Sequence, residues 1–245
     1  MFPSNGRSFG LGSSPMKTKR PRLTMPISAR HIPLGFALIA AAVCAFSASP
    51  ARAASICGDG TYAYAGFDGG TGTRGVSATI SQAGPLGVRD GHVAGWVGVV
   101  DPRTDAGWLQ VGLSALPNET TSEIYYEVAF PGHAPVYHQV RTGVAVGEPH
   151  RFAVLELQGR SNWWRVWVDG KPATAPLHLQ GSHGRWSAQV LGESWAGTAS
   201  GACNTYRYAF DGVSLLAANG RMPAQHDPNY AVVRRSPTSF VATSL

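Results

Sequence analysis

Three polar side chains that could carry chemistry lie on segments with the alternating pattern of β-strands. Gln110 stands between Trp108 and Gly112, on the side of its segment that turns away from the apolar residues. Glu127 and Glu193 occupy similar positions in two later segments. A carboxylate can act as a general base toward water, and an amide can donate hydrogen bonds to a developing oxyanion. Together on one face, these groups would suit the hydrolysis of a peptide bond by water.

Aromatic side chains accompany these polar groups. Trp96, Tyr125 and Trp195 fall on the same side of their alternating segments as the neighbouring polar residues. A curved sheet that collects rings and carboxyl groups on one face makes an elongated groove. We therefore predict a substrate-binding groove lined by Trp96, Trp108, Tyr125, Glu127 and Trp195.

The elements that would position these residues are strands. Period-two alternation recurs along the chain and is interrupted by clusters of Gly, Pro, Asn and Asp, whereas helical periodicity is nearly absent. About ten strands with short connections indicate an all-β fold, an antiparallel β-sandwich or jelly roll in one domain over residues 54–217. The expected strands cover 62–67, 75–81, 92–100, 107–114, 124–129, 136–142, 150–158, 163–169, 186–195 and 206–216.

Four short motifs resemble the glutamic peptidases, also called eqolisins or the peptidase G1 family. They are GWVGV at 95–99, WLQVGLS at 108–114, YYEV at 125–128 and ESW at 193–195. The resemblance implies a concanavalin-like jelly roll in which Gln110 and Glu193 are the catalytic residues and Trp96 lines the substrate groove. It also implies an endopeptidase that works at acid pH through a water molecule activated by the glutamate.

The chain departs from the family pattern at two places. Val128 stands where a tryptophan usually follows the Tyr-Glu pair, and Asp101 lies slightly beyond the family's aspartate. Gly112, two residues after the glutamine, is expected to leave room for a substrate backbone.

Two other functions stay open on the sequence. A carbohydrate-binding jelly roll without hydrolysis would suit a face rich in indole rings, on which sugars stack. The tryptophans concerned are Trp96, Trp108, Trp163, Trp167 and Trp195. Alternatively, Glu127 and Glu193 could be the carboxylate pair of a glycoside hydrolase. The expected partner is thus a polypeptide or, failing that, a glycan. Because the sequence has no His-Glu-x-x-His motif, we expect no metal ion, and we expect no cofactor.

The first 53 residues have the features of an export signal. Seven of the 20 basic residues lie there, and all 14 acidic residues follow. An apolar segment, 32–46, leads to an Ala-x-Ala sequence, which predicts a signal peptide cleaved after Ala53 and a secreted or periplasmic protein. A transmembrane anchor is the alternative, although the apolar segment is shorter than the roughly 20 residues that span a bilayer.

Removal of this leader leaves a nearly neutral domain with 13 basic and 14 acidic residues. The basic excess of the full chain therefore belongs to the leader and predicts no nucleic-acid partner. We expect the domain itself to be a monomer without membrane association. Scarce lysine and abundant alanine and glycine are compatible with a GC-rich bacterial genome.

Two features concern the ends of the domain. Cys57 and Cys203 are the cysteines that remain after the leader, and two cysteines in an exported domain predict a disulfide between them, with two unpaired thiols as the alternative. Residues 218–245 contain three prolines, the Arg234–Arg235 pair and little periodicity. We expect this segment to be a loosely ordered tail.

Overall fold

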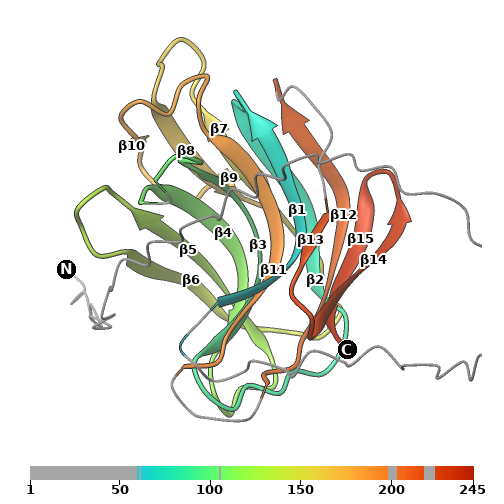
Figure 1. Ribbon diagram of the computed structural model, residues 1–245. Coiled ribbons are helices and arrows are strands. Elements are labelled where there is room, and N and C mark those ends of the chain that lie inside the picture. Colours follow the sequence, from blue (N-terminus) through green and yellow to red (C-terminus); the bar gives the residue numbers. More distant parts are fainter. Residues whose placement is uncertain (1–59, 61, 105, 198–202, 218–223) are drawn as a thin grey trace, which may run out of the picture. The chain divides into compact units, whose positions relative to one another are not determined.

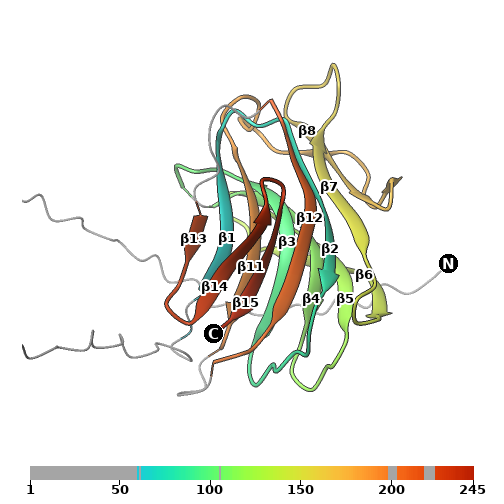
Figure 2. The same ribbon diagram turned by 90° about the vertical axis from the view of Figure 1, so that its right-hand side faces the viewer.

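Two antiparallel sheets packed face to face make up the described part of the chain (Figures 1 and 2). The computed structural model describes residues 60, 62–104, 106–197, 203–217 and 224–245. Within these ranges there are strands, turns and bends, and no helix that is long and apolar enough to cross a membrane. The predicted signal peptide and Cys57 lie outside the described residues, so the cleavage after Ala53 and the disulfide to Cys203 stay predictions.

The sheet that carries the candidate site is called the front sheet. In spatial order it contains β13 (Ala224–His226), β1 (Tyr62–Thr71), β11 (Ser187–Trp195), β3 (His92–Val100), β4 (Trp108–Ala115), β5 (Ser122–Ala129) and β6 (Val136–Val144). The chain crosses between sheets several times before β11 inserts between β1 and β3. Residues far apart in sequence therefore become neighbours at the centre of this sheet.

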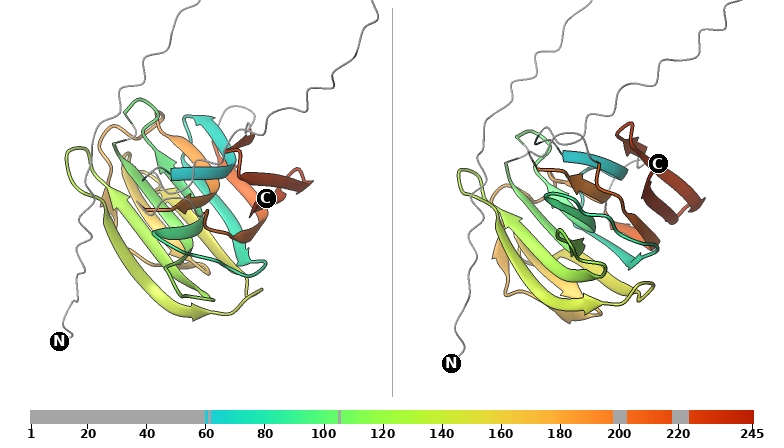
Figure 3. Two further views of the ribbon diagram at one scale, coloured as in Figure 1. Left: turned by 60° about the horizontal axis from the view of Figure 1, so that its bottom comes forward. Right: turned by 90° about the horizontal axis from the view of Figure 1, so that it is seen from below.

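The other sheet is called the back sheet. In spatial order it contains β10 (Leu177–His178), β8 (Trp163–Val168), β7 (His150–Glu156), β2 (Gly75–Gln82), β12 (Arg207–Leu216), β15 (Ser239–Ser244) and β14 (Tyr230–Ser236). The two-residue strand β9 (Lys171–Pro172) also pairs with β8. The end-on views of Figure 3 show the hairpin of β14 and β15 on the side of the sandwich away from β5 and β6.

The structure confirms the all-β antiparallel sandwich that the alternation predicts. Each of the ten expected segments corresponds to one strand. The largest difference is in β1, which was expected to end at Phe67 but continues to Thr71. The pairing of β1 with β11 shifts in register between Asp68 and Thr71, where Gly69 and Gly70 lie. This irregularity accommodates the two glycines, so the strand continues past them.

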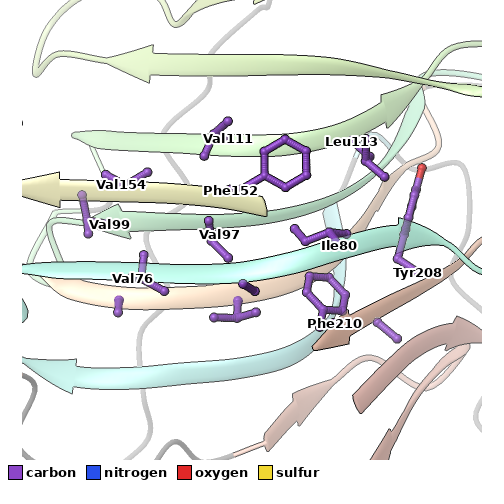
Figure 4. Packing of buried hydrophobic residues seen from close by; sticks show 14 of the residues in the cluster. Val76, Ile80, Val97, Val99, Val111, Leu113, Phe152, Val154, Tyr208 and Phe210 are labelled. Carbon is purple, nitrogen blue, oxygen red and sulfur yellow. The ribbon is translucent and has the colours of Figure 1, made fainter. Parts of the chain in front are cut away.

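The core comes from the inward side of each alternation. Figure 4 shows front-sheet residues such as Val97 and Val111 facing Val76, Ile80 and Phe152 of the back sheet. All five side chains are at most 1% exposed. Burying a side chain of this size stabilises the fold by roughly 1.5–3 kcal/mol. The two sheets are therefore held together by their apolar sides, which leaves the outer side of each sheet for other contacts.

The C-terminal segment differs from the loosely ordered tail expected for residues 218–245. From Ala224 onward it forms β13, β14 and β15, and β15 pairs with β12 inside the back sheet. Phe240 is 2% exposed and packs against Phe67 and Phe210, with ring centroids 4.7 and 4.5 Å apart. The hairpin is short and contains two arginines, so its alternation is weak, but buried residues such as Tyr230 and Phe240 dock it on the core.

Substituting Phe240 with alanine tests this docking. We expect Phe240→Ala to lower the free energy of unfolding by about 3–5 kcal/mol, because it opens a cavity beside two aromatic rings. Urea unfolding followed by tryptophan fluorescence measures the change. Val233→Ala, on the exposed side of β14, is the control and should shift stability by about 0.5 kcal/mol or less. A loosely ordered tail would instead make the two variants equivalent.

Candidate active site

The candidate site lies on the outer side of the front sheet, which we call the site face. In β4, Leu109, Val111 and Leu113 are fully buried in the core, so the residues between them point the opposite way. Directly opposed residues of antiparallel strands share a face, and the observed pairing extends the site face across the sheet. It carries the residues Trp96, Trp108, Gln110, Tyr125, Glu127, Glu193 and Trp195.

Gln110 forms the centre of a hydrogen-bonded group on this face. Its Nε2 atom lies 3.1 Å from Oε2 of Glu127, the residue directly opposite on β5, and 3.2 Å from the hydroxyl of Tyr125. Gln110 is 7% exposed and Tyr125 2% exposed. The amide of Gln110 is therefore fixed in orientation by two partners within a mostly buried setting.

Glu127 is a carboxyl group with an unusual affinity for its proton. The pKa of Glu127 is raised from 4.5 to about 7, first by burial and second by the negative charge of Glu193, while His92 and a hydrogen bond from Trp108 act in the opposite direction. Glu127 therefore keeps its proton at mildly acidic pH, where an exposed glutamate would be ionised. A pair of carboxyl groups whose surroundings act differently on them is typical of acid–base catalysis.

Glu193 is more deeply buried than the half-buried Glu127, and its two oxygens have separate partners. Nε1 of Trp96 donates to Oε2 at 2.9 Å, and Nε2 of His92 lies 2.8 Å from Oε1. The side chain of Glu193 is 5% exposed and that of His92 25% exposed. Trp96 thus orients the carboxylate of Glu193, and His92 links it to the solvent side of the face.

Gln110 and Glu193 have no hydrogen-bond partner in common among the described residues, and their backbones lie well apart. Gln110 lies opposite Gly98 of β3, whereas Glu193 lies opposite Ala94. Their backbones are therefore four residues apart along β3 and two strands apart across it, on the order of 13 Å by 10 Å. The Gln110–Glu193 dyad stays a prediction, while the structure brings Gln110 together with Glu127.

Aromatic side chains surround both carboxyl groups. Trp96 and Tyr125 pack with Ala94 and Leu191 in a small cluster separate from the main core. The ring of Tyr62 stacks on Trp195, with centroids 6.2 Å apart, and Tyr62 is 41% exposed. The site face therefore has a buried aromatic floor and a more exposed ring pair where β1 begins and β11 ends.

The expected cluster of five tryptophans does not form. Trp163 and Trp167 lie on β8, in the back sheet, on the side that points away from Val166 and the core. Arg160 and Arg165 sit over these two rings, with their guanidinium carbons 4.4 and 5.8 Å from the ring centroids. The prediction that they share one face with Trp96, Trp108 and Trp195 is wrong, because the alternation within β8 cannot tell which sheet contains it.

Sequence reasoning missed several residues of the site face. Gln189 of β11 lies opposite Gly98, directly across from Gln110, and Asp68 of β1 lies next to Gln189. Buried Glu123 accepts hydrogen bonds from Tyr137 and Gln139. The signal for Gln189 is its position two residues before Leu191 and four before Glu193, which places it on their face, but only the strand pairing reveals its neighbours.

Two residues have roles other than those suggested by the sequence. A Cβ atom on Gly112 would lie 2.1 Å from the carbonyl oxygen of Gly95. This glycine therefore permits the close approach of β3 and β4, and it does not provide the expected space for a substrate backbone. Asp101 follows β3 and accepts hydrogen bonds from Arg103 and Thr104, which keeps the pKa of its carboxyl below the ordinary value. Asp101 thus organises the β3–β4 turn.

Two cavities lie near the edges of the sandwich. A cavity of about 300 Å³ lies beside Arg234 and the turn between β14 and β15, and one of about 390 Å³ lies at Asn118–Glu123. The candidate catalytic groups line neither of them.

Solved glutamic peptidases share this fold. Scytalido-glutamic peptidase with a peptide-based transition-state analogue superposes with a TM-score of 0.53 at 17% sequence identity, over 75% of this chain and 98% of the other. SCP-B, an eqolisin in complex with the tripeptide Ala-Ile-His, gives 0.50 at 15% identity over the same shares. A laminarinase catalytic domain from Thermotoga petrophila gives 0.36 at 15% identity, over 54% of this chain and 55% of that domain.

No family model matches the sequence, and curated proteins give no match either. At these identities the likeness to the peptidases shows the fold, a concanavalin-like sandwich, and leaves the chemistry to the residues of the site face.

The raised pKa of Glu127 predicts a pH-dependent stability. Between its unfolded pKa of 4.5 and its folded pKa of about 7, the folded protein holds a proton that the unfolded chain releases, so stability falls as pH rises through this window. Glu127→Gln removes the effect. Relative to the wild type, we expect the variant to gain up to about 3 kcal/mol between pH 4.5 and pH 7.5.

Urea unfolding at these two pH values measures this gain. Val136→Ala, an exposed position on β6, is the control and should differ from the wild type by the same amount at both pH values. An equal difference for Glu127→Gln at both pH values would show that Glu127 is not the group responsible.

Proposed function

We propose that the protein is a secreted hydrolase of polypeptides that binds an extended substrate across the site face and cleaves a peptide bond with water. The observation that carries this proposal is the contact between the Gln110 amide and the proton-retaining carboxyl group of Glu127, on a face that also holds the buried Glu193. The fold shared with glutamic peptidases supports a polypeptide substrate.

The two carboxyl groups supply complementary proton transfers. Glu193, as the carboxylate, takes a proton from the attacking water as its oxygen bonds to the substrate carbonyl carbon. Glu127, protonated up to about pH 7, gives its proton to the leaving nitrogen as the C–N bond breaks. The products are a carboxylic acid and an amine, and solvent returns both glutamates to their starting states.

Gln110 has a role that neither carboxylate can fill. A neutral amide offers both hydrogen-bond donors and an acceptor and carries no charge. With both N–H groups bonded to Tyr125 and Glu127, its Oε1 can accept a hydrogen bond from the attacking water and orient it without repelling Glu193. The hydroxyl of Tyr125 and the carboxyl of Glu127 hold its Nε2 in place, so the amide needs little reorganisation during the reaction.

Hydrolysis of denatured casein from pH 3 to pH 8 tests the proposal. We expect activity to fall as pH rises through about 7, because Glu127 then loses the proton that the leaving amine requires. Gln110→Ala, Glu127→Gln and Glu193→Gln should each reduce kcat by about 100-fold or more. Glu148→Gln, a carboxylate-to-amide change at the β6–β7 connection, is the matched control and should keep full activity.

The variants also separate the roles of the two carboxyl groups. Loss of the alkaline limb in Glu127→Gln would identify Glu127 as the acid, and full activity of Glu193→Gln would remove Glu193 from the mechanism. An inactive wild type at every pH would refute the proposed hydrolysis of polypeptides.

Glycan binding is the second candidate, favoured by the stacked rings of the exposed Tyr62 and the half-buried Trp195. A sugar ring could stack on such a platform. If the protein binds oligosaccharides, Trp195→Ala should weaken the affinity by about tenfold in calorimetric titration, whereas Trp163→Ala on the back sheet should not. Cleavage of the same oligosaccharides, abolished by Glu127→Gln and Glu193→Gln, would instead indicate a glycoside hydrolase. Absence of oligosaccharide binding would exclude both.

A further inference from the structure

Gln110 and Gln189 form a symmetric arrangement around Gly98 on the site face. Gly98 of β3 pairs with Gln110 on one side and with Gln189 of β11 on the other. The backbones of the two glutamines are thus separated by two strand spacings, about 10 Å. Only a glycine lies between these two amide side chains.

The glycine keeps the space between the glutamines open. A Cβ atom on Gly98 would lie 2.9 Å from Cβ of Gln110 and 2.9 Å from the carbonyl oxygen of Leu109. Any larger residue would therefore push against Gln110 and fill the gap. Because Gly98 has no side chain, an extended main chain lying over β3 on the site face would have one glutamine on each side.

The two amides have complementary groups available for a ligand. Nε2 of Gln110 is occupied by Tyr125 and Glu127, whereas its Oε1 accepts no hydrogen bond from the described residues. Gln189 is half-buried, and its amide likewise makes no hydrogen bond within the described part of the chain. One side therefore presents an acceptor, and the other can present a donor.

We propose that Gln110 and Gln189 form a clamp over Gly98 that binds one backbone amide of an extended polypeptide. Oε1 of Gln110 accepts the substrate N–H, and Nε2 of Gln189 donates to the substrate carbonyl. The proposal rests on the proposed function for the identity of the substrate and adds Gln189 as a positioning residue. Recognition through the main chain tolerates many side chains but excludes proline at the residue whose N–H is bound.

Two substitutions of Gln189 test the hydrogen bond that its Nε2 donates to the substrate while keeping the size of the side chain nearly constant. Gln189→Leu keeps a similar volume without polar atoms, and Gln189→Glu keeps the length but loses the N–H donor. Each should raise KM for a peptide substrate by about five- to tenfold with kcat nearly unchanged, because the bond is made in both the ground and transition states. Gln158→Leu, an exposed glutamine after β7, is the matched control.

A binding measurement separates the clamp from catalysis. Calorimetric titration of an unreactive N-methyl peptide series should reveal one backbone position where methylation weakens binding to the wild type by about five- to tenfold. Gln189→Leu should weaken binding of the unmethylated parent peptide by a similar factor. Thermal unfolding midpoints equal to that of the wild type show that the variant is folded.

The outcomes distinguish the two proposals. Peptide hydrolysis with unchanged KM in Gln189→Leu overturns the clamp and leaves the proposed function standing. Peptide binding that depends on Gln189 without hydrolysis supports the clamp and overturns the catalytic proposal. A higher kcat in Gln189→Glu overturns the clamp, because position 189 would then serve proton transfer. No peptide binding and no hydrolysis refutes both.

Discussion

The electrostatic repulsion between the buried Glu193 and the half-buried Glu127 on the site face is the interaction on which the site depends. Each negative charge raises the free energy of the other, and burial weakens the solvation that would offset this repulsion. The surroundings resolve the conflict differently for the two groups. Glu193 receives an indole N–H and an imidazole, whereas Glu127 keeps its proton to about pH 7 beside a neutral amide. The aromatic floor and the glutamine therefore belong to the same electrostatic arrangement.

The positions of the strands, and the face to which each side chain points, could be predicted from the sequence because both are local properties. Alternation in the β4 segment places the side chain of Gln110 on the other face of the strand from those of Leu109 and Val111, without knowledge of any partner strand. The pairing of strands is not local. That Gln189 faces Gln110 across Gly98 depends on β11 entering the sheet between β1 and β3, and no spacing within β11 encodes this register. The same limitation explains why Trp163 and Trp167 were assigned to the wrong face.

The C-terminal hairpin shows a different limit of sequence patterning. Tyr230 and Phe240 are the deeply buried aromatic residues of this segment, and the exposed residues of β14 include a pair of arginines. A polar segment with only two such residues has the composition of a disordered tail. Its order depends on aromatic rings elsewhere in the chain, which the segment's own sequence does not show. Tyr230 stacks on Tyr206 at 5.2 Å and donates to the carbonyl of Asn204, so it is fixed by a segment more than twenty residues earlier.

The order in which strands meet has a consequence for how the chain folds. β1 pairs with β11 and β13, and β2 pairs with β12. Strands near the start of the domain therefore cannot form these pairs until strands near its end are available. Such long-range pairing makes folding slow, since chain entropy is lost before the contacts form. A nascent polypeptide of this kind stays open until nearly all of it has been synthesised. Folding of this domain would therefore follow its synthesis rather than accompany it.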